Sequence, residues 1–266
     1  MAHPLTRGLD IDDPSTTQAR RQIIQRKGFL RQIYQEWYAA IAAALPAGRE
    51  PVLELGSGAG FLERFVPGLI TSDIVHCPHI GIVLDGQQLP FSDSTLRAIV
   101  MTNVLHHMPR PRRFFAEAAR CVQLGGVVVM IEPWVTPWSR LVYTNLHHEP
   151  FDTEAPDWSF SSAGPLSGAN GALAWMIIER DRPQFEQEFP EWQIQTIEPC
   201  MPFCYLLSGG VSLRSLTPGF AFSCWRRMEN SLQRWMKTWA MFALIVLVLT
   251  GTPSGNIVEL PSGGPQ

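Results

Sequence analysis

The sequence has no excess of basic residues and no CxxC cysteine pair. The formal net charge of the 266 residues is -3 at pH 7, and no basic stripe alternates with aromatic residues, so nucleic acid is not an expected partner. The five cysteines are odd in number and lack the paired spacing of a metal site. We therefore predict free thiols in a reducing compartment and no bound metal.

The sequence also shows no secretory pattern and no apolar run of membrane-spanning length. Residues Asp10 to Ser15 are acidic and interrupted by proline, unlike a secretory leader. The apolar run Trp239 to Leu249 is shorter than the roughly 20 residues that cross a bilayer, and its Ile, Val and Leu are typical of a buried strand. We expect a soluble, cytoplasmic protein without a membrane span, although an exposed Trp239 to Leu249 would seat it peripherally on a bilayer.

What the sequence does contain is a helical N-terminal segment followed by alternating strands and helices. Hydrophobic residues recur at helical spacing from Ser15 to Leu45, where Gly28 is a point of division into two helices. Short apolar runs then predict strands at Val52–Leu55, Leu69–Ile74, Ile80–Leu84, Leu96–Thr102 and Gly126–Glu132, with a helix at Pro111–Gln123. This alternation predicts an α/β fold with a mostly parallel sheet. The Ile74 to Ile80 link is too short for the usual crossover helix.

The second half of the sequence is less regular. The Pro-, Trp- and Ser-rich stretch from Pro133 to Asn170 predicts loop and short helix that could cover a site. Arg182–Phe189 is predicted as a short helix and Trp192–Ile197 as a strand. Phe220–Met236 is predicted as a helix that precedes the apolar strand.

The segment that carries chemistry is VLELGSGAG, from Val52 to Gly60. An apolar strand enters three glycines at alternate positions, and we expect Phe61 to Phe65 to continue as a helix. Such glycines allow a ligand to approach the backbone closely. A dinucleotide site needs G-x-G-x-x-G, but Phe61 stands where the third glycine belongs. Glu54 would repel a pyrophosphate and suits a ligand with an ammonium and a sulfonium.

At this point the chain resembles the class I S-adenosylmethionine-dependent methyltransferases of the small-molecule type (methyltransferase type 11-like), over about residues 50 to 133. The resemblance implies a Rossmann-like fold, with helices on both sheet faces, an antiparallel last strand and an N-terminal helical extension. It also implies donor-binding roles, which fall on Glu54, Gly56, Ser57, Gly58 and Gly60 for the methionine part, Asp73 for the ribose, Asp85 and Gly86 for the adenine, and Asn103 near the methyl. Asp73 or Asp85 taken alone is equally well a turn former or helix cap.

The acceptor side has weaker signals, all of them histidines and tryptophans. His106 and His107 follow the fourth strand, and His106 is a candidate catalytic base, with core packing as the alternative. His148, beside Glu149, is a second candidate, for which a polar helix end is the leading alternative. The scattered residues Trp134, Trp138, Trp158 and Trp175 either wall an acceptor pocket or belong to the core.

The sequence thus predicts an enzyme that transfers a methyl group from S-adenosylmethionine to a small-molecule or lipid-like acceptor. We expect a single domain over residues 1–266, with a helical segment at 1–48, a donor-binding half at 49–133, an acceptor-side half at 134–250 and a flexible tail at 251–266. The acceptor would lie between Glu132 and the Pro133–Asn170 stretch. A non-catalytic scaffold with the same fold and, less favoured, an NAD(P)-dependent oxidoreductase are the alternatives.

Overall fold

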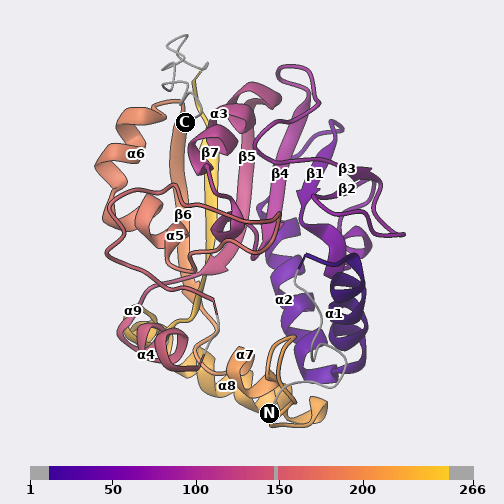
Figure 1. The fold of residues 1–266 in the computed structure, drawn as a ribbon. Coiled ribbons are helices and arrows are strands. Elements are labelled where there is room, and N and C mark those ends of the chain that lie inside the picture. Colours follow the sequence, from indigo (N-terminus) through magenta and orange to yellow (C-terminus); the bar gives the residue numbers. More distant parts are fainter. Residues whose placement is uncertain (1–11, 147–148, 252–266) are drawn as a thin grey trace.

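Seven strands form one mixed sheet in the computed structural model, which describes residues 12–146 and 149–251. The strands are β1 (Val52–Leu55), β2 (Ile70–Asp73), β3 (Ile82–Val83), β4 (Leu96–Thr102), β5 (Val122–Pro133), β6 (Trp192–Cys200) and β7 (Phe242–Leu249). Their order is β3-β2-β1-β4-β5-β7-β6 (Figure 1). The pairs from β3 to β5 are parallel, and β7 is antiparallel to both β5 and β6. This confirms the predicted Rossmann-like sheet with an antiparallel last strand.

The central strands are apolar on both faces because helices cover both faces. In β4, Ala98, Ile99, Val100 and Met101 are all fully buried. Ile99 and Met101 belong to one hydrophobic core and Ala98 and Val100 to the other, as expected when successive side chains of a strand point to opposite sides. This double burial explains why β4 is a nearly continuous apolar run.

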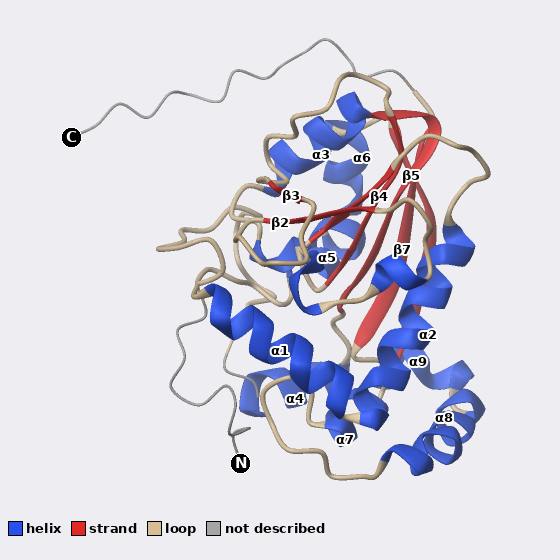
Figure 2. Cartoon of the chain, turned by 90° about the vertical axis from the view of Figure 1, so that its right-hand side faces the viewer, coloured by secondary structure: helices blue, strands red, loops and turns tan. Residues whose placement is uncertain are grey.

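Different parts of the chain supply the helices on the two faces. The predicted N-terminal helical segment forms α1 (Pro14–Arg26) and α2 (Gly28–Ala44), with the division at Lys27 beside the predicted Gly28. Ile33, Trp37 and Ile41 of α2 are buried in one core. The other core holds side chains of α3 (Pro111–Cys121), α5 (Leu173–Trp175) and α6 (Arg182–Glu188). Figure 2 shows α3, α5 and α6 on one side of the strands and α2 on the other.

The remaining helices lie beyond the carboxyl ends of the parallel strands. They are α4 (Pro137–Leu146), α7 (Cys204–Ser208), α8 (Phe222–Ser231) and α9 (Met236–Trp239), and Figure 1 shows them together below the sheet. The single helix predicted over Phe220–Met236 is therefore interrupted, and α8 ends at Ser231. Residues of α4, α7 and α1 line a cavity at this end of the sheet.

One sequence prediction near the glycine turn is wrong. No α-helix follows β1 in this described stretch, and the chain instead makes two 3-10 turns, at Ser57–Ala59 and Leu62–Arg64. Pro67 and Gly68 come directly afterwards, and Gly68 has a φ of +74°. Proline cannot continue a helix and glycine in this conformation terminates one, so only one turn fits before β2. The link from β2 to β3 lacks a helix, as its length predicts.

The apolar run Trp239 to Leu249 is a strand inside the sheet. Most of it forms β7, which lies between β5 and β6, and Ile245 and Leu247 are fully buried. The alternative that this run is exposed and seats on a bilayer is therefore wrong. Among the helices of the described residues, none has the length and apolar character needed to cross a membrane. Of the predicted tail, residues 252–266 lie outside the described part of the chain.

Candidate active site

A cavity of about 810 Å³ lies at the carboxyl ends of the parallel strands. Its walls combine residues from the glycine turn and the ends of β2, β4 and β5 with residues from α1, α4, α7 and the loops around them. Between β1 and β4 the order of the strands reverses, and ligands of open α/β sheets bind in the crevice at this point. The volume is within the ordinary range for small-molecule sites, roughly 300–1,000 Å³.

The glycine turn leaves no room for side chains at any of its three glycines, and at Gly60 a Cβ atom would overlap the Tyr38 hydroxyl. Gly56 has a φ of +70°, and a Cβ atom there would overlap the Val104 side chain. At Gly58, a Cβ atom would overlap Thr17 of α1 and would lie 2.6 Å from Asp73 Oδ2. Glycine is therefore favoured at these positions by the close approach of neighbouring segments.

Glu54 lies behind this turn and is fully buried. Its Oε2 accepts a hydrogen bond from Ser57 Oγ (2.6 Å), and its carbonyl oxygen accepts one from Ser72 Oγ (2.6 Å). Burial raises the pKa of the Glu54 carboxyl to about 8. Of the residues predicted for the methionine part of the donor, only Gly56 is a lining residue of the cavity; Glu54, Ser57, Gly58 and Gly60 shape the turn from behind.

The two predicted acidic residues both line the cavity. Asp73 ends β2, where Oδ2 accepts from the Gly58 amide (2.9 Å) and Oδ1 from the Val75 amide (3.1 Å). Burial raises the pKa of Asp73 above its ordinary value, although these backbone hydrogen bonds oppose the shift. Asp85 is exposed, and its carboxylate accepts from the Gln87 amide (2.9 Å). Gly86 adjoins it in the cavity wall.

The end of β4 contributes a strained residue and an unsatisfied hydroxyl. Asn103 has a φ of +57°, in the left-handed region that few residues other than glycine adopt. Thr102 Oγ1 is buried and has no hydrogen-bond partner. Both residues line the cavity, and such strain and orphaned polar atoms occur together at ligand sites. Sequence reasoning found Asn103 but missed Thr102, which has no distinguishing motif.

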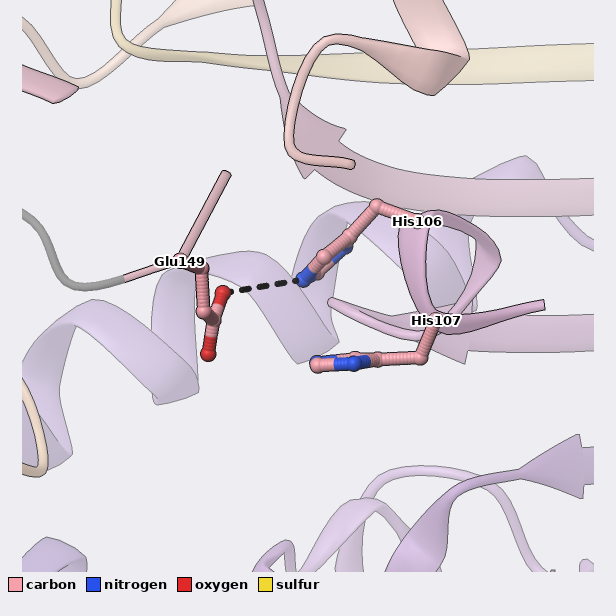
Figure 3. Close-up of side chains that lie close together, drawn as sticks. All are labelled: His106, His107 and Glu149. Carbon is pink, nitrogen blue, oxygen red and sulfur yellow. Dashed lines mark ion pairs between the residues drawn. The ribbon is translucent and has the colours of Figure 1, made fainter. Parts of the chain in front are cut away.

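A cluster of His106, His107 and Glu149 lies farther along the same cavity (Figure 3). His106 Nδ1 is 2.6 Å from Glu132 Oε2, and Glu132 Oε1 accepts from the Val104 (2.7 Å) and Leu105 (2.8 Å) amides. The other nitrogen, His106 Nε2, is 3.6 Å from Glu149 Oε2. His106 therefore lies between two carboxylates.

The two adjacent histidines have opposite electrostatic environments. Burial on its own would lower the pKa of His106, but Glu132 and Glu149 outweigh it and raise this pKa to about 10. For His107, burial and the nearby charge of His106 lower the pKa to about 4. At neutral pH His106 is thus protonated and His107 neutral.

The acceptor-side predictions for His148 and for the four tryptophans have different outcomes. His148 lies outside the described residues, and its neighbour Glu149 faces His106. Trp134 and Trp158 are buried in the hydrophobic core, and none of the four suggested tryptophans is among the described residues that line the cavity. Aromatic walls come instead from Tyr34, Tyr143, Phe151, Tyr205 and Phe242. These residues are distant in sequence, so no local pattern brings them together.

The strand order and the cavity at the strand ends define a class I methyltransferase fold. Residues 53–130 match the family model for the methyltransferase domain. This segment is therefore similar to a methyltransferase domain, and the chain has a Rossmann-like methyltransferase fold. A search of curated proteins gave no match to the chain.

Three solved structures illustrate the similarity of the fold. A chain in the complex of the Haloferax volcanii Trm112 methyltransferase activator with a methyltransferase is 13% identical, with a TM-score of 0.51, and the match covers 91% of this chain and 98% of that one. Geranyl diphosphate C-methyltransferase from Streptomyces coelicolor A3(2) is 11% identical, with a TM-score of 0.51 and coverage of 93% and 88%. A geranyl diphosphate methyltransferase in complex with S-adenosylmethionine is 13% identical, with a TM-score of 0.51 and coverage of 90% and 92%.

Proposed function

We propose that this protein transfers the methyl group of S-adenosylmethionine to a small-molecule or lipid-like acceptor. The observation that carries the proposal is the continuity of the cavity. The same cavity is lined by Gly56 of the glycine turn and Asp73, by aromatic residues and by the cluster around His106. A donor and an acceptor bound in one cavity can react without a separate transfer step.

The donor half of the cavity fits S-adenosylmethionine chemically. Asp73 and Asp85 offer carboxylate oxygens that can accept from ribose hydroxyls and an adenine amino group, and Thr102 offers an unpaired hydroxyl. At Gly56, which has no side chain, the backbone of the turn would contact the ligand directly. When bound, the donor supplies an activated methyl group on a sulfonium. The chain's own contribution is to hold donor and acceptor in line and exclude water.

The acceptor half favours a molecule with a substantial apolar part. Its walls include Tyr143, Phe151, Tyr205, Leu206 and Phe242, so an apolar chain or ring would be buried there. Two proteins of the same fold methylate geranyl diphosphate, a prenyl compound, which agrees with a lipid-like acceptor. The organic acceptor would present its reacting atom towards the polar cluster.

His106 stays our candidate for contact with the acceptor, but its environment changes the role that we propose. Because its pKa is raised to about 10, the free protein holds His106 in the protonated form at neutral pH. A protonated imidazole donates a hydrogen bond to an acceptor oxygen and is a poor proton acceptor. His106 would therefore orient the acceptor.

The two alternative functions, an NAD(P)-dependent oxidoreductase and a non-catalytic scaffold, are distinguished from methyl transfer by different observations. A dinucleotide enzyme places pyrophosphate on a helix N-terminus after the glycine turn, whereas this turn leads into 3-10 turns. The NAD(P) alternative is accordingly disfavoured by geometry as well as by glycine spacing. A non-catalytic scaffold would keep the same fold and cavity, so turnover has to be measured to distinguish it.

Donor binding is tested by titration calorimetry with S-adenosylmethionine. We expect saturable binding to the wild type and at least tenfold weaker binding to Gly58→Val, because the added side chain would displace Asp73 and Thr17. Gly28→Ala is the matched control, since a Cβ atom there meets only Gly219 Cα, at 3.7 Å. Asp73→Asn, which keeps the shape of the turn, should also weaken binding.

Two results would contradict the proposal. The first is no saturable binding of the donor by the folded wild type at high micromolar concentration. The second is equal affinity for the wild type and for both the Gly58→Val and Asp73→Asn variants. Donor binding without formation of S-adenosylhomocysteine across a broad panel of acceptors would instead support the scaffold.

A further inference from the structure

We propose that His106, His107 and Glu149 form a binding site for one divalent transition-metal ion of the zinc type. Each residue offers one ligand atom, and these atoms all lie within 4.8 Å of one another. All three residues line the cavity, and Figure 3 shows the Glu149 carboxylate facing the two imidazole rings. A metal ion placed between them would be coordinated by two imidazole nitrogens and one carboxylate oxygen.

Hydrogen bonds already hold both imidazoles in the orientation that a metal site requires. His106 Nδ1 is bonded to Glu132 Oε2 (2.6 Å), and His107 Nδ1 is bonded to the Gly168 carbonyl oxygen (3.1 Å). In His107 this leaves Nε2 available to a ligand, whereas in His106 a metal ion would have to displace the proton that Nε2 directs towards Glu149. Metal-binding histidines characteristically bond their second nitrogen to a carboxylate or a backbone carbonyl, which fixes the tautomer and the ring.

The carboxylate behind His106 is itself rigidly placed. Glu132 is fully buried on β5, and its second oxygen accepts two backbone amides, from Val104 and Leu105. Because the same short segment carries His106 and His107, these bonds position both rings at once. The site is therefore largely preorganised, apart from Glu149, whose side chain is 18% exposed.

The donor set indicates which ions the site would take. Mg²⁺ and Ca²⁺ prefer oxygen ligands only, whereas imidazole nitrogens suit Zn²⁺ and the neighbouring transition metals. Two histidines and one glutamate are also the protein ligands of a class of zinc sites that keep a fourth position open. Here that position would face the cavity.

An open position in the acceptor half defines a chemical class of acceptor. If the proposed methyl transfer is correct, an acceptor with a hydroxyl or thiol group would occupy this position as its anion, having released its proton to solvent on binding, with its apolar part along the aromatic wall. The methyl group would then pass from the donor sulfur to this oxygen or sulfur, which leaves S-adenosylhomocysteine as the second product. Hydrocarbon carbon atoms do not coordinate such an ion. This part of the inference rests on the proposed function, whereas the metal site itself does not.

The site is tested on the full chain, stripped with a chelator and titrated with Co²⁺ and with Zn²⁺. We expect one ion per chain, with visible Co²⁺ absorption bands typical of nitrogen and oxygen ligands in a low-coordinate site. Glu149→Gln and His107→Ala should each weaken affinity by tenfold or more. His76→Ala and Glu154→Gln are matched controls, since both residues are exposed and lie outside the cluster.

The outcomes separate this inference from the proposed function. Stoichiometric binding that is lost in both cluster variants and kept in both controls supports the site. An absence of stoichiometric binding, or binding unchanged in Glu149→Gln and His107→Ala, overturns it. Donor calorimetry on the same stripped samples reports on methyl-donor binding independently, so either proposal can fail while the other stands.

Discussion

Replacement of Glu54 by glutamine should stabilise the protein at neutral pH and reduce the pH dependence of its stability. Glu54 is 3% exposed, and burial raises the pKa of its carboxyl from the ordinary 4.5 to about 8. Glu63 and Asp73 add to this increase, while Ser57 and Arg21 oppose it. The folded protein therefore retains a proton that the unfolded chain releases at lower pH.

The sign and the size follow from this difference in proton binding. Between pH 4.5 and pH 8 the folded state binds more protons than the unfolded state, so the free energy of unfolding falls as the pH rises. Each pKa unit corresponds to about 1.4 kcal/mol, so the Glu54 contribution lost between pH 4.5 and pH 7 is about 3 kcal/mol. It is fully present below pH 4.5 and is lost completely near pH 8.

Urea denaturation of the wild type and Glu54→Gln at several pH values between 5 and 8 measures this effect. Glutamine keeps an oxygen that can accept from Ser57 Oγ and has no proton to lose in this range. The two free energies should be similar near pH 5 and diverge by about 1.4 kcal/mol per pH unit above it. Glu186→Gln, an exposed substitution on α6, controls for loss of a surface carboxylate. Parallel pH curves for the wild type and Glu54→Gln would refute the reasoning.

Four further predictions concern the turn, the core, the cavity and the thiols. Gly56→Ala should weaken donor binding at least tenfold in calorimetry, because its backbone is left-handed and Val104 blocks a Cβ atom. Phe115→Ala, on the buried face of α3, should lower the free energy of urea unfolding by about 3–5 kcal/mol. Leu206→Trp should reduce acceptor turnover and leave donor affinity unchanged, because it fills the acceptor half. Cys224 is exposed and should react first with a thiol reagent.

Each of these has a result that would count against it. Donor affinity equal to that of the wild type in Gly56→Ala would show that the turn tolerates a side chain. A loss below 1 kcal/mol in Phe115→Ala would contradict its complete burial. Weaker donor binding in Leu206→Trp would mean that the two halves of the cavity are not separate. Fast labelling that persists in Cys224→Ser would indicate that another thiol is accessible.

Local patterns in the sequence were sufficient for most of the sheet. The predicted limits of β1 and β4 are the observed ones, because each strand is a short apolar run between turn residues. The helix expected after Gly60 was wrong although a signal against it was present. Pro67 and Gly68 allow only one turn before β2, because proline cannot continue a helix and Gly68 has a positive φ.

The acceptor side could not be predicted because its contacts join segments that are remote in sequence. His106 was identified as a candidate by its position after β4. Its contacts with Glu132 and Glu149 depend on the positions in space of β5, which carries Glu132, and of the segment after α4, which carries Glu149. Likewise, the orphaned hydroxyl of Thr102 is visible only once its surroundings are known. Residue type and spacing contain no information on such contacts.

The position of β7 has a consequence for biosynthesis. Among the described residues this strand comes last in chain order, yet it lies between β5 and β6, and β6 pairs with no other strand there. While a ribosome still holds residues 242–249, β5 has an open edge and β6 has no place in the sheet. Such unpaired edges favour aggregation, so the nascent chain depends on residues 242–249 to close the sheet and avoid misassembly.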